Sequence, residues 1–336
     1  MTSGPPLYRP VRIGQLSLSG NLFLAPVAGY SDRAFRSLCI ECGASFTYTE
    51  MVSSEALTRE SGKTEDLLKR SPNEQQYAVQ LFGSDPVRMA DAARIVIDRT
   101  RAECIDINAG CPVPKIVKTG AGSALTREPE KLHIIVKAVT QAVSVPVTVK
   151  IRSGWDESSI TWKEAASAAL EAGAAAITLH PRTRAQGYEG KARWDHLAEL
   201  VNFVHEKAPS VPVFGSGDLF SPEDARSMLS TTLCDGIMFA RGAMGNPFIF
   251  TQTKELLLTG QHTDIPPHIR IQAGWKELLQ LVDDAGEIGG CREMRKRFCA
   301  YSKGIEGGAT IREEIVHAST ITEYRRIFES RGISLN

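Results

Sequence analysis

The sequence has no long hydrophobic run, no signal-like leader and no regular cysteine pattern. No apolar stretch among the 336 residues approaches the ~18 residues that a membrane-spanning helix needs. The first ten residues lack the basic and then apolar order of a secretory signal peptide. The seven cysteines are odd in number and irregularly spaced, which favours a reducing compartment over a disulfide framework. These absences predict a cytoplasmic protein that does not enter a membrane.

Neither sign of charge is in excess, because 39 Lys and Arg residues balance 39 Asp and Glu residues. A zero net charge does not favour nucleic-acid binding, but a local basic patch would be enough for it. Residues 291–336 hold such a local excess, with nine basic and six acidic residues. The densest part, which we call the tail cluster, consists of Arg292, Arg295, Lys296 and Arg297. On charge alone, a solvated helix face is the preferred interpretation of the tail cluster.

Several chemical motifs are also missing. The sequence has no G-x-x-x-x-G-K-[ST] loop, which argues against an NTPase. The pair Cys39-x-x-Cys42 has no second pair with zinc-ligand spacing, so we interpret both cysteines as core residues of a helix. Glu50 and Asp218 do not form a recognisable carboxylate dyad. Apart from alternating strands and helices, we find no internal repeat and no low-complexity segment.

What the sequence does contain is a series of short apolar runs separated by segments with helical spacing. The runs are apolar almost throughout, as expected of parallel strands that are covered on both faces. Eight such strands alternating with helices predict a (β/α)₈ TIM barrel, with a doubly wound open sheet as the alternative. The region 53–73 fits least well, because it is polar and gives no clear second helix. The expected strands are 22–25, 46–49, 78–82, 104–107, 147–151, 176–180, 213–215 and 236–239.

Expected helices between these strands include 32–42, 86–97, 129–142, 162–172 and 222–229. Three of them have a capping residue at or before the first turn, in Ser31-Asp32, Ser84-Asp85-Pro86 and Ser221-Pro222-Glu223.

The alternation of strands and helices stops after residue 247. Four further segments have helical spacing with no strand between them, namely 248–258, 268–283, 292–305 and 311–329. A connector that contains Gly and Pro spans 260–267. We therefore predict an α/β barrel domain in residues 1–254, followed by an all-helical domain in residues 255–336 that resembles a four-helix bundle.

A single thiol stands at the end of the fourth expected strand. The strand 104–107 runs into the turn 108–112, which holds Cys111 at its tip, just past a carboxamide. Basic residues follow at Lys115 and Lys118. A thiol at the carboxyl end of a barrel strand, beside a cationic loop, is placed for chemistry on an anionic substrate. The alternative is a buried structural cysteine, which is the commoner fate of a lone cysteine.

Glycine-rich turns follow the last two expected strands, in Gly215-Ser216-Gly217-Asp218 and Ala240-Arg241-Gly242. Glycine lets backbone N–H groups approach a phosphate, and Arg241 offers two parallel donors to it. Phosphate-binding barrels often use these two loops. Ordinary turn glycines are the alternative interpretation.

Polar side chains end three more expected strands, at Gln80, Lys150 and His180. Side chains of these types can hydrogen-bond the polar edge of a flavin and tune its electronics. A buried Lys150 would instead be suited to a Schiff base, as in barrel aldolases, but that reading leaves Cys111 and Gln80 without a role.

In order and spacing, these residues resemble the tRNA-dihydrouridine synthase family, most nearly its bacterial B-type branch. The match is strong over residues 11–255 and weak in the helical tail. It rests on LAPVAGYSD (24–32), QLFGSDP (80–86), DINAGCP (106–112), GSAL (122–125), VKIRSGW (149–155), HPRTRAQGY (180–188) and GAMGNP (242–247).

The resemblance implies a barrel that binds FMN and a helical domain that recognises RNA. It implies reduction of the C5–C6 double bond of particular D-loop uridines in tRNA, with NADPH as the reductant. Cys111 would be the general acid that protonates C5 while reduced flavin delivers a hydride to C6. This role agrees with the negative charge that hydride addition at C6 develops at C5. The uridine would have to leave its stack to reach the mouth of the barrel.

The same resemblance implies the binding residues. FMN is expected over Pro26, Val27 and Ala28, with its ring edge on Gln80, Lys150 and His180 and its phosphate side on Ser216, Gly217, Asp218, Ala240 and Arg241. Asn108 and Arg182 are expected to position the base. Contacts with tRNA are expected from Lys115, Lys118, Arg184 and the tail cluster, Arg292, Arg295, Lys296 and Arg297.

Three positions depart from the family pattern, since Val27, Ser216 and Ala240 stand where the family usually has Met, Asn and Gly. These changes shorten two side chains near the ring and add a methyl group beside the phosphate site, which predicts modestly weaker FMN binding. Three rival functions remain: a small-molecule ene-reductase like dihydroorotate dehydrogenase, a non-catalytic tRNA-binding protein and a Schiff-base lyase. Nothing in the sequence requires more than a monomer, and NADPH rather than NADH rests on the resemblance alone.

Overall fold

An antiparallel hairpin, β1 (Val11–Ile13) and β2 (Leu16–Leu18), precedes the barrel and was not among the expected elements. The computed structural model describes residues 6–59 and 62–335; the first five residues of the predicted barrel domain, two residues of the region 53–73 and the last residue lie outside this description. Alternate hairpin residues are buried against side chains at the beginnings of the barrel strands. The hairpin therefore closes the end of the barrel at which the strands begin.

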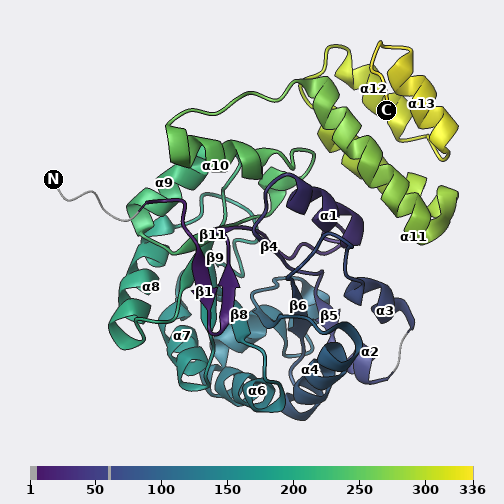
Figure 1. Cartoon of the computed structure of the whole chain (residues 1–336). Coiled ribbons are helices and arrows are strands. Elements are labelled where there is room, and N and C mark those ends of the chain that lie inside the picture. Colours follow the sequence, from purple (N-terminus) through teal and green to yellow (C-terminus); the bar gives the residue numbers. More distant parts are fainter. Residues whose placement is uncertain (1–5, 60–61, 336) are drawn as a thin grey trace.

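Nine parallel strands curl around a common axis, in the order β4-β3-β11-β10-β9-β8-β7-β6-β5 (Figure 1). β4 and β5 stand at the two ends of this order, yet they are consecutive in the chain, and Tyr48 between them bridges to Ala78 of β6. β4 and β5 are two halves of one interrupted strand of the barrel. Counted in this way, the barrel has the eight strands that were predicted, and the TIM-barrel prediction is confirmed. The strands are β3 (Leu22–Leu24), β4 (Phe46–Thr47), β5 (Val52–Ser53), β6 (Ala78–Phe82), β7 (Cys104–Ala109), β8 (Val147–Gly154), β9 (Ala176–Thr183), β10 (Val213–Ser216) and β11 (Gly236–Phe239).

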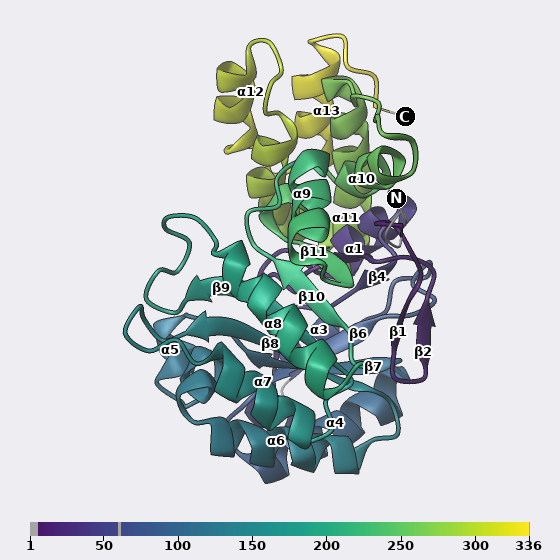
Figure 2. The same ribbon diagram turned by 90° about the vertical axis from the view of Figure 1, so that its left-hand side faces the viewer.

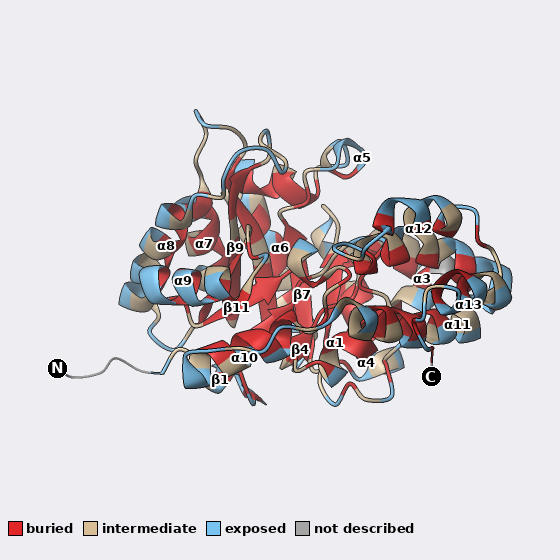
Figure 3. Ribbon diagram, turned by 90° about the horizontal axis from the view of Figure 1, so that it is seen from above, coloured by how far each residue is buried: buried red, intermediate tan, exposed pale blue. Residues whose placement is uncertain are grey.

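Helices cover the outside of the barrel, with their buried faces toward the strands and their exposed faces outward (Figure 3). The expected capping residues act as predicted: Asp32, Asp85 and Ser221 each accept a backbone N–H from the first turn of their helix. The region 53–73 forms two short helices, α2 and α3. The barrel helices are α1 (Arg33–Glu41), α2 (Ser54–Thr58), α3 (Gly62–Leu68), α4 (Pro86–Thr100), α5 (Pro114–Val117), η1 (Gly122–Arg127), α6 (Pro129–Ala142), α7 (Trp162–Glu171), α8 (Trp194–Lys207), α9 (Pro222–Thr232), η2 (Arg241–Ala243) and α10 (Ile249–Thr259).

The chain ends in three helices that stand apart from the barrel, α11 (Pro267–Tyr301), α12 (Gly308–Ile315) and α13 (Ile321–Glu329) (Figure 1). The two segments expected at 268–283 and 292–305 are one long helix, which Gly286 interrupts with φ 73° and ψ 165°. The segment expected at 311–329 is divided into α12 and α13, and α13 begins with a capping box at Thr320. The predicted boundary between residues 254 and 255 falls inside α10, which packs on α9, and it stays a prediction. No helix in the described part of the chain has the length and hydropathy to cross a membrane.

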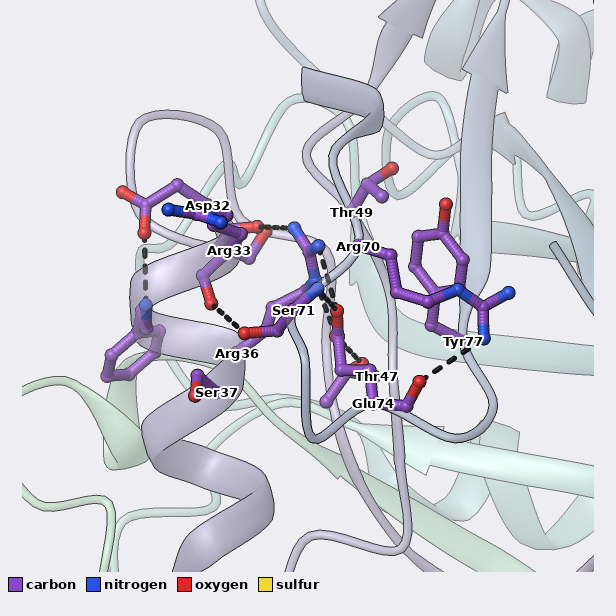
Figure 4. A network of polar contacts seen from close by, with 12 residues as sticks. Asp32, Arg33, Arg36, Ser37, Thr47, Thr49, Arg70, Ser71, Glu74 and Tyr77 are labelled. Carbon is purple, nitrogen blue, oxygen red and sulfur yellow. Dashed lines mark hydrogen bonds and ion pairs between the residues drawn. The ribbon is translucent and has the colours of Figure 1, made fainter. Parts of the chain in front are cut away.

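The terminal helices meet the barrel through α1, which packs against α11 (Figure 2). One face of α1 shares a hydrophobic cluster with α11 to α13, and the helix carries the core cysteines Cys39 and Cys42, both buried as predicted. The other face is tied to the barrel by a buried ion pair, in which Nε of Arg36 lies 2.7 Å from Oε1 of Glu74 (Figure 4). The Thr47 hydroxyl and the Ser71 N–H also donate to the Glu74 carboxylate, at 2.5 and 2.7 Å. This network attaches α1 to β4 and to the loop before β6.

Candidate active site

A cavity of about 490 Å³ lies at the carboxyl ends of the barrel strands. Every residue predicted to hold FMN lines it, together with Asn108 and Cys111. The chain folds these side chains together because parallel strands end at the same rim of the barrel. The predicted cofactor residues in the lining are Pro26, Val27, Ala28, Gln80, Lys150, His180, Ser216, Gly217, Asp218, Ala240 and Arg241.

Cys111 stands on a turn that Asn108 organises at the end of β7. The Asn108 side-chain oxygen accepts the N–H groups of Gly110 and Cys111, at 3.1 and 2.9 Å. Gly122 packs behind this turn at φ +60°, and an added Cβ would lie 2.7 Å from the Cys111 carbonyl oxygen. The Cys111 side chain is nearly buried, and burial raises the pKa of its thiol above the ordinary value, although nearby cations partly oppose the shift. Cys111 therefore keeps its proton at neutral pH.

A chain of hydrogen bonds orients the amides at the cavity wall. Nδ2 of Asn108 donates to Oε1 of Gln80 at 2.8 Å, and Nε2 of Gln80 donates to Asp106 at 2.5 Å. The hydroxyl of Thr148 donates to the other Asp106 oxygen at 2.5 Å. Asp106 is fully buried, and this burial raises its pKa to about 6 in spite of the two donors. Because Asp106 accepts the Gln80 amino group, both amides have a defined orientation toward the cavity.

Two basic side chains from β8 make the cavity electropositive. Removal from bulk water lowers the pKa of Lys150 to about 8 and that of Arg152 to about 10. The same effect, reinforced by these neighbouring cations, holds the pKa of His180 well below its usual range, so its imidazole is neutral. Arg152 donates to the carbonyl groups of Gly110, Thr183 and Gly187 at 2.8–2.9 Å. A cavity with these charges favours a ligand with an anionic or electron-rich edge.

The two glycine-rich turns lie at the other side of the cavity. Gly217 has φ +104°, and an added Cβ would lie 2.8 Å from the His180 ring. The guanidinium carbon of Arg241 lies 4.7 Å from the ring centroid of Tyr188 and 5.1 Å from that of Phe220. Its only carboxylate neighbour in the described chain is Asp218, at 3.5 Å. The two rings therefore hold Arg241 in place, and the N–H groups that do not face Asp218 can bind an anion.

The chain is similar to one family of proteins along nearly its whole length. Residues 23–331 match the family model described as dihydrouridine synthase. The chain is 56% identical over 326 residues to the "Probable tRNA-dihydrouridine synthase" of Treponema pallidum, with 96% of each chain covered. It is 39% identical over 303 residues to tRNA-dihydrouridine synthase B of Pseudomonas putida, covering 90% of this chain and 88% of that one.

The chain belongs to the dihydrouridine synthase family.

The family that the motifs predicted is thus confirmed, and with it an enzyme of the oxidoreductase class. The fold of the chain is also similar to that of a histamine dehydrogenase from Rhizobium sp. 4-9, with a TM-score of 0.56. That match covers 80% of this chain and 50% of the other at 16% sequence identity, so the likeness concerns the fold alone.

The residues of the cavity fit a flavin nucleotide. Gln80 and Lys150 offer hydrogen-bond donors, and Gly217 and Gly242 line the cavity without side chains of their own. Close packing requires glycine at Gly242, where an added Cβ would lie 2.1 Å from the Leu219 carbonyl oxygen. Of the three departures from the family pattern, Ser216 donates its hydroxyl to the Met238 carbonyl at 3.2 Å and is satisfied within the protein. Val27 and Ala240 are half-buried in the lining and block neither glycine turn.

Of the nine predicted substrate residues, eight lie outside the cavity lining, four of them in the barrel and four in the tail cluster. Arg182 is buried behind the cavity, where it forms two hydrogen bonds with Asp218, at 2.8 and 2.7 Å. Arg184 is half-buried in the next turn of the chain, beside the Trp155 ring. Lys115 and Lys118 are exposed, on α5 and directly after it. The structure therefore brings Asn108 to the cavity, but it does not bring Arg182 to it.

The tail cluster lies on α11, and its members are used in different ways. Arg292 is exposed, whereas Arg295 donates to the carbonyl groups of Ala318 and His317, at 2.7 and 3.3 Å. Lys296 donates to the Gly29 carbonyl at 2.7 Å.

Arg297 is fully buried. It forms ion pairs with Asp32, Glu277 and Glu293, so its guanidinium is held inside the protein. The sequence showed a dense run of charge, but it did not show which face of the helix is covered by the barrel. Arg297 therefore has a structural role between α11 and α1, and its contact with tRNA stays a prediction.

Several other lining residues had no role assigned from the sequence, among them Met51, Arg152, Tyr188, Phe220 and Met244. Arg152 and Tyr188 lie within family motifs, so a signal for them existed. Met51 lies between β4 and β5, beyond the end of the strand predicted at 46–49. Met244 also lies within a family motif, whereas Phe220 belongs to no pattern that distinguishes it from other apolar residues.

Proposed function

We propose that the protein is a tRNA-dihydrouridine synthase that uses FMN and NADPH to reduce the C5–C6 double bond of specific D-loop uridines. The observation that carries this proposal is the shared cavity, in which Cys111 and Asn108 line the same space as the residues suited to a flavin. Similarity to tRNA-dihydrouridine synthases over nearly the whole chain supports tRNA as the substrate. The seven free thiols of the described chain fit a reducing cytoplasm, and we infer that the protein acts there as a monomer.

Cys111 is proposed to be the general acid that protonates uracil C5. A general acid must retain its proton until negative charge develops on the carbon, and burial of the Cys111 thiol provides this. The turn made by Asn108 sets the position of the thiol before the base arrives. Asn108 also presents its amide at the cavity wall, where we infer that it hydrogen-bonds the flipped base.

The remaining lining residues are proposed to hold FMN, which when bound and reduced supplies the hydride for uracil C6. Gln80, Lys150 and His180 would bind the polar edge of the ring, and Pro26, Val27 and Ala28 would cover its face. Ser216, Gly217, Asp218, Ala240 and Arg241 would surround the phosphate. We place Lys115, Lys118, Arg184 and Arg292 on the tRNA-binding surface.

The proposal predicts that deletion of the gene removes dihydrouridine from defined D-loop positions, and that Cys111→Ala fails to restore it. Loss of a general acid lowers the rate by about 10²–10⁴-fold. The measurement is mass-spectrometric mapping of tRNA from the deletion strain, rescued with wild type or with the variant. Cys299→Ala, which removes a half-buried thiol from α11, is the matched control and should restore the modification.

Purified Cys111→Ala should retain bound flavin, which would show that the cavity remains intact. An unchanged dihydrouridine map in the deletion strain would contradict the tRNA assignment. Turnover of free pyrimidines by the purified protein would then favour the small-molecule reductase.

A further inference from the structure

Two arginines and a tryptophan form a stacked cluster on the barrel rim, outside the cavity lining. The guanidinium carbons of Arg127 and Arg184 lie 4.5 and 4.7 Å from the ring centroid of Trp155. Arg127 ends η1, Trp155 directly follows β8, and Arg184 directly follows β9. We call these three residues the rim cluster. Because each residue comes from a different rim loop, the cluster exists only in the folded barrel.

Neither arginine forms an ion pair with a carboxylate in the part of the chain that the structure describes. The acidic residues that follow Arg127 and Trp155 in sequence are engaged elsewhere, since Glu128 pairs with Lys131 at 3.8 Å and Asp156 accepts the Ser158 hydroxyl at 2.7 Å. In addition, Nε of Arg184 is buried without a hydrogen-bond partner. The ring distances place the two guanidinium carbons no more than about 9 Å apart. Two cations at this separation repel each other, and an anion that lies near both would offset this repulsion.

The rim cluster lies on the opposite side of the barrel from the terminal helices. If β4 and β5 are counted as one strand, β8 is the fourth strand from β3 in either direction around the closed barrel. α1 follows β3, and α11 packs on α1. Figure 2 shows the terminal helices at the top and the loops beyond β8 and β9 toward the left. A macromolecule that is bound by the terminal helices and extends across the cavity mouth would therefore reach the rim cluster.

We propose that Arg127 and Arg184, positioned by Trp155, bind a backbone phosphate of the tRNA on this far side of the cavity mouth. The inference rests on the proposed function, because it names a further contact of the same substrate. A guanidinium presents planar pairs of N–H donors to a phosphate, and stacking on an aromatic ring restricts where those donors point. Lys115 and Lys118 extend the positive charge onto α5, which contacts η1.

The phosphates of NADPH are a second source of the same chemistry. A tRNA phosphate is favoured because the rim cluster lies outside the cavity lining and opposite the helices that would hold the rest of the tRNA. The two sources can be separated, because reduction of the flavin by NADPH can be followed without tRNA present.

The test uses Arg127→Gln, Arg184→Gln and the double variant of the full-length holoenzyme. Binding of a fluorescently labelled tRNA transcript is measured by anisotropy over a series of KCl concentrations. Each single substitution is expected to weaken binding several-fold at low salt. Loss of one phosphate contact should reduce the slope of log K against log[KCl] by about 0.7–0.9. Arg12→Gln is the charge-matched control, because Arg12 is exposed on β1 at the closed end of the barrel, and it should bind as the wild type does.

Wild-type affinity and slope in the double variant would overturn the proposal, while dihydrouridine formation by the wild type would leave the proposed function standing. If the substitutions change the NADPH dependence of flavin reduction but leave tRNA binding unchanged, the rim cluster binds the reductant. That result would also overturn the proposal. If the wild type itself neither binds nor modifies tRNA, the proposed function and the phosphate contact both fall.

Discussion

At the scale of single residues, Lys150 shows how the barrel changes the chemistry of a side chain. It is half-buried at the cavity wall beside Arg152, and both features lower its pKa to about 8, although Asp106 favours the charged form. The ammonium group is therefore charged at neutral pH and loses its charge as the pH rises through 8. A ligand that accepts a hydrogen bond from the ammonium group should bind less tightly above that pH.

This reasoning predicts that FMN affinity of the flavin-free protein falls above pH 8, by at most about tenfold per pH unit while one proton is linked to binding. The affinity can be measured by titrating the flavin-free protein with FMN and following flavin fluorescence, at pH values from about 6.5 to about 9.5 that span the pKa of Lys150. Lys150→Met should bind FMN more weakly at neutral pH and should lose the dependence near pH 8. A pH profile that is the same in wild type and variant would show that Lys150 does not bind the cofactor.

At the scale of elements, the ion pair between Arg36 and Glu74 attaches α1 to the barrel. Both side chains are almost completely buried, and the Glu74 carboxylate also accepts from Thr47 and Ser71 (Figure 4). Removal of one partner from such a pair leaves an uncompensated charge in the interior. Glu74→Ala should therefore lower the free energy of unfolding by about 3–5 kcal/mol, measured by urea denaturation.

The control for this prediction is Glu329→Ala, which breaks the exposed pair of Arg325 and Glu329 on α13 and should cost no more than about 0.5 kcal/mol. The double variant Arg36→Met/Glu74→Leu should recover much of the lost stability, because it removes both buried charges. Equal losses in Glu74→Ala and Glu329→Ala would contradict the structural role of the buried pair.

The elements also show how far the sequence could predict the fold. β6 and α6 match their expected bounds, since each has a strong periodic pattern and a clear start. The strand expected at 46–49 is shorter in the structure, as β4 pairs with β3, and β5, which pairs with β6, was not expected. The long α11 was expected as two helices, because 284–291 is rich in glycine and acidic residues. Such outcomes depend on tertiary pairing, which local patterns do not contain.

For the site, strand ends predicted the lining well, because parallel strands bring their carboxyl ends to one rim. Charge density predicted less, since it does not distinguish exposed Arg292 from buried Arg297. The proximity of Arg127 to Trp155 could not be predicted, because these residues come from separate loops.

At the scale of the whole molecule, the terminal helices hold the loop that covers the cavity. Residues 26–28 line the cavity, and the next residue, Gly29, is bound on both sides of its backbone. Its N–H donates to Glu50, and its carbonyl oxygen accepts from Lys296 of α11 at 2.7 Å. The Tyr30 ring lies under Lys296 and Arg297, at 5.6 and 4.8 Å. We therefore expect the position of α11 to influence how the loop binds a cofactor.

Lys296→Met should weaken FMN binding about fivefold, since a partly exposed hydrogen bond from a charged donor contributes about 1 kcal/mol. The reason is that Gly29 loses one of its two anchors while the cavity lining itself is unchanged. The measurement is flavin fluorescence titration of the flavin-free variant at pH 7, with urea unfolding to show that its stability is retained. Lys303→Met, which removes an exposed lysine just beyond α11, is the charge-matched control and should bind FMN normally. Equal FMN affinity in the two variants would mean that the terminal helices do not set the cavity loop, and their role would then be confined to the substrate.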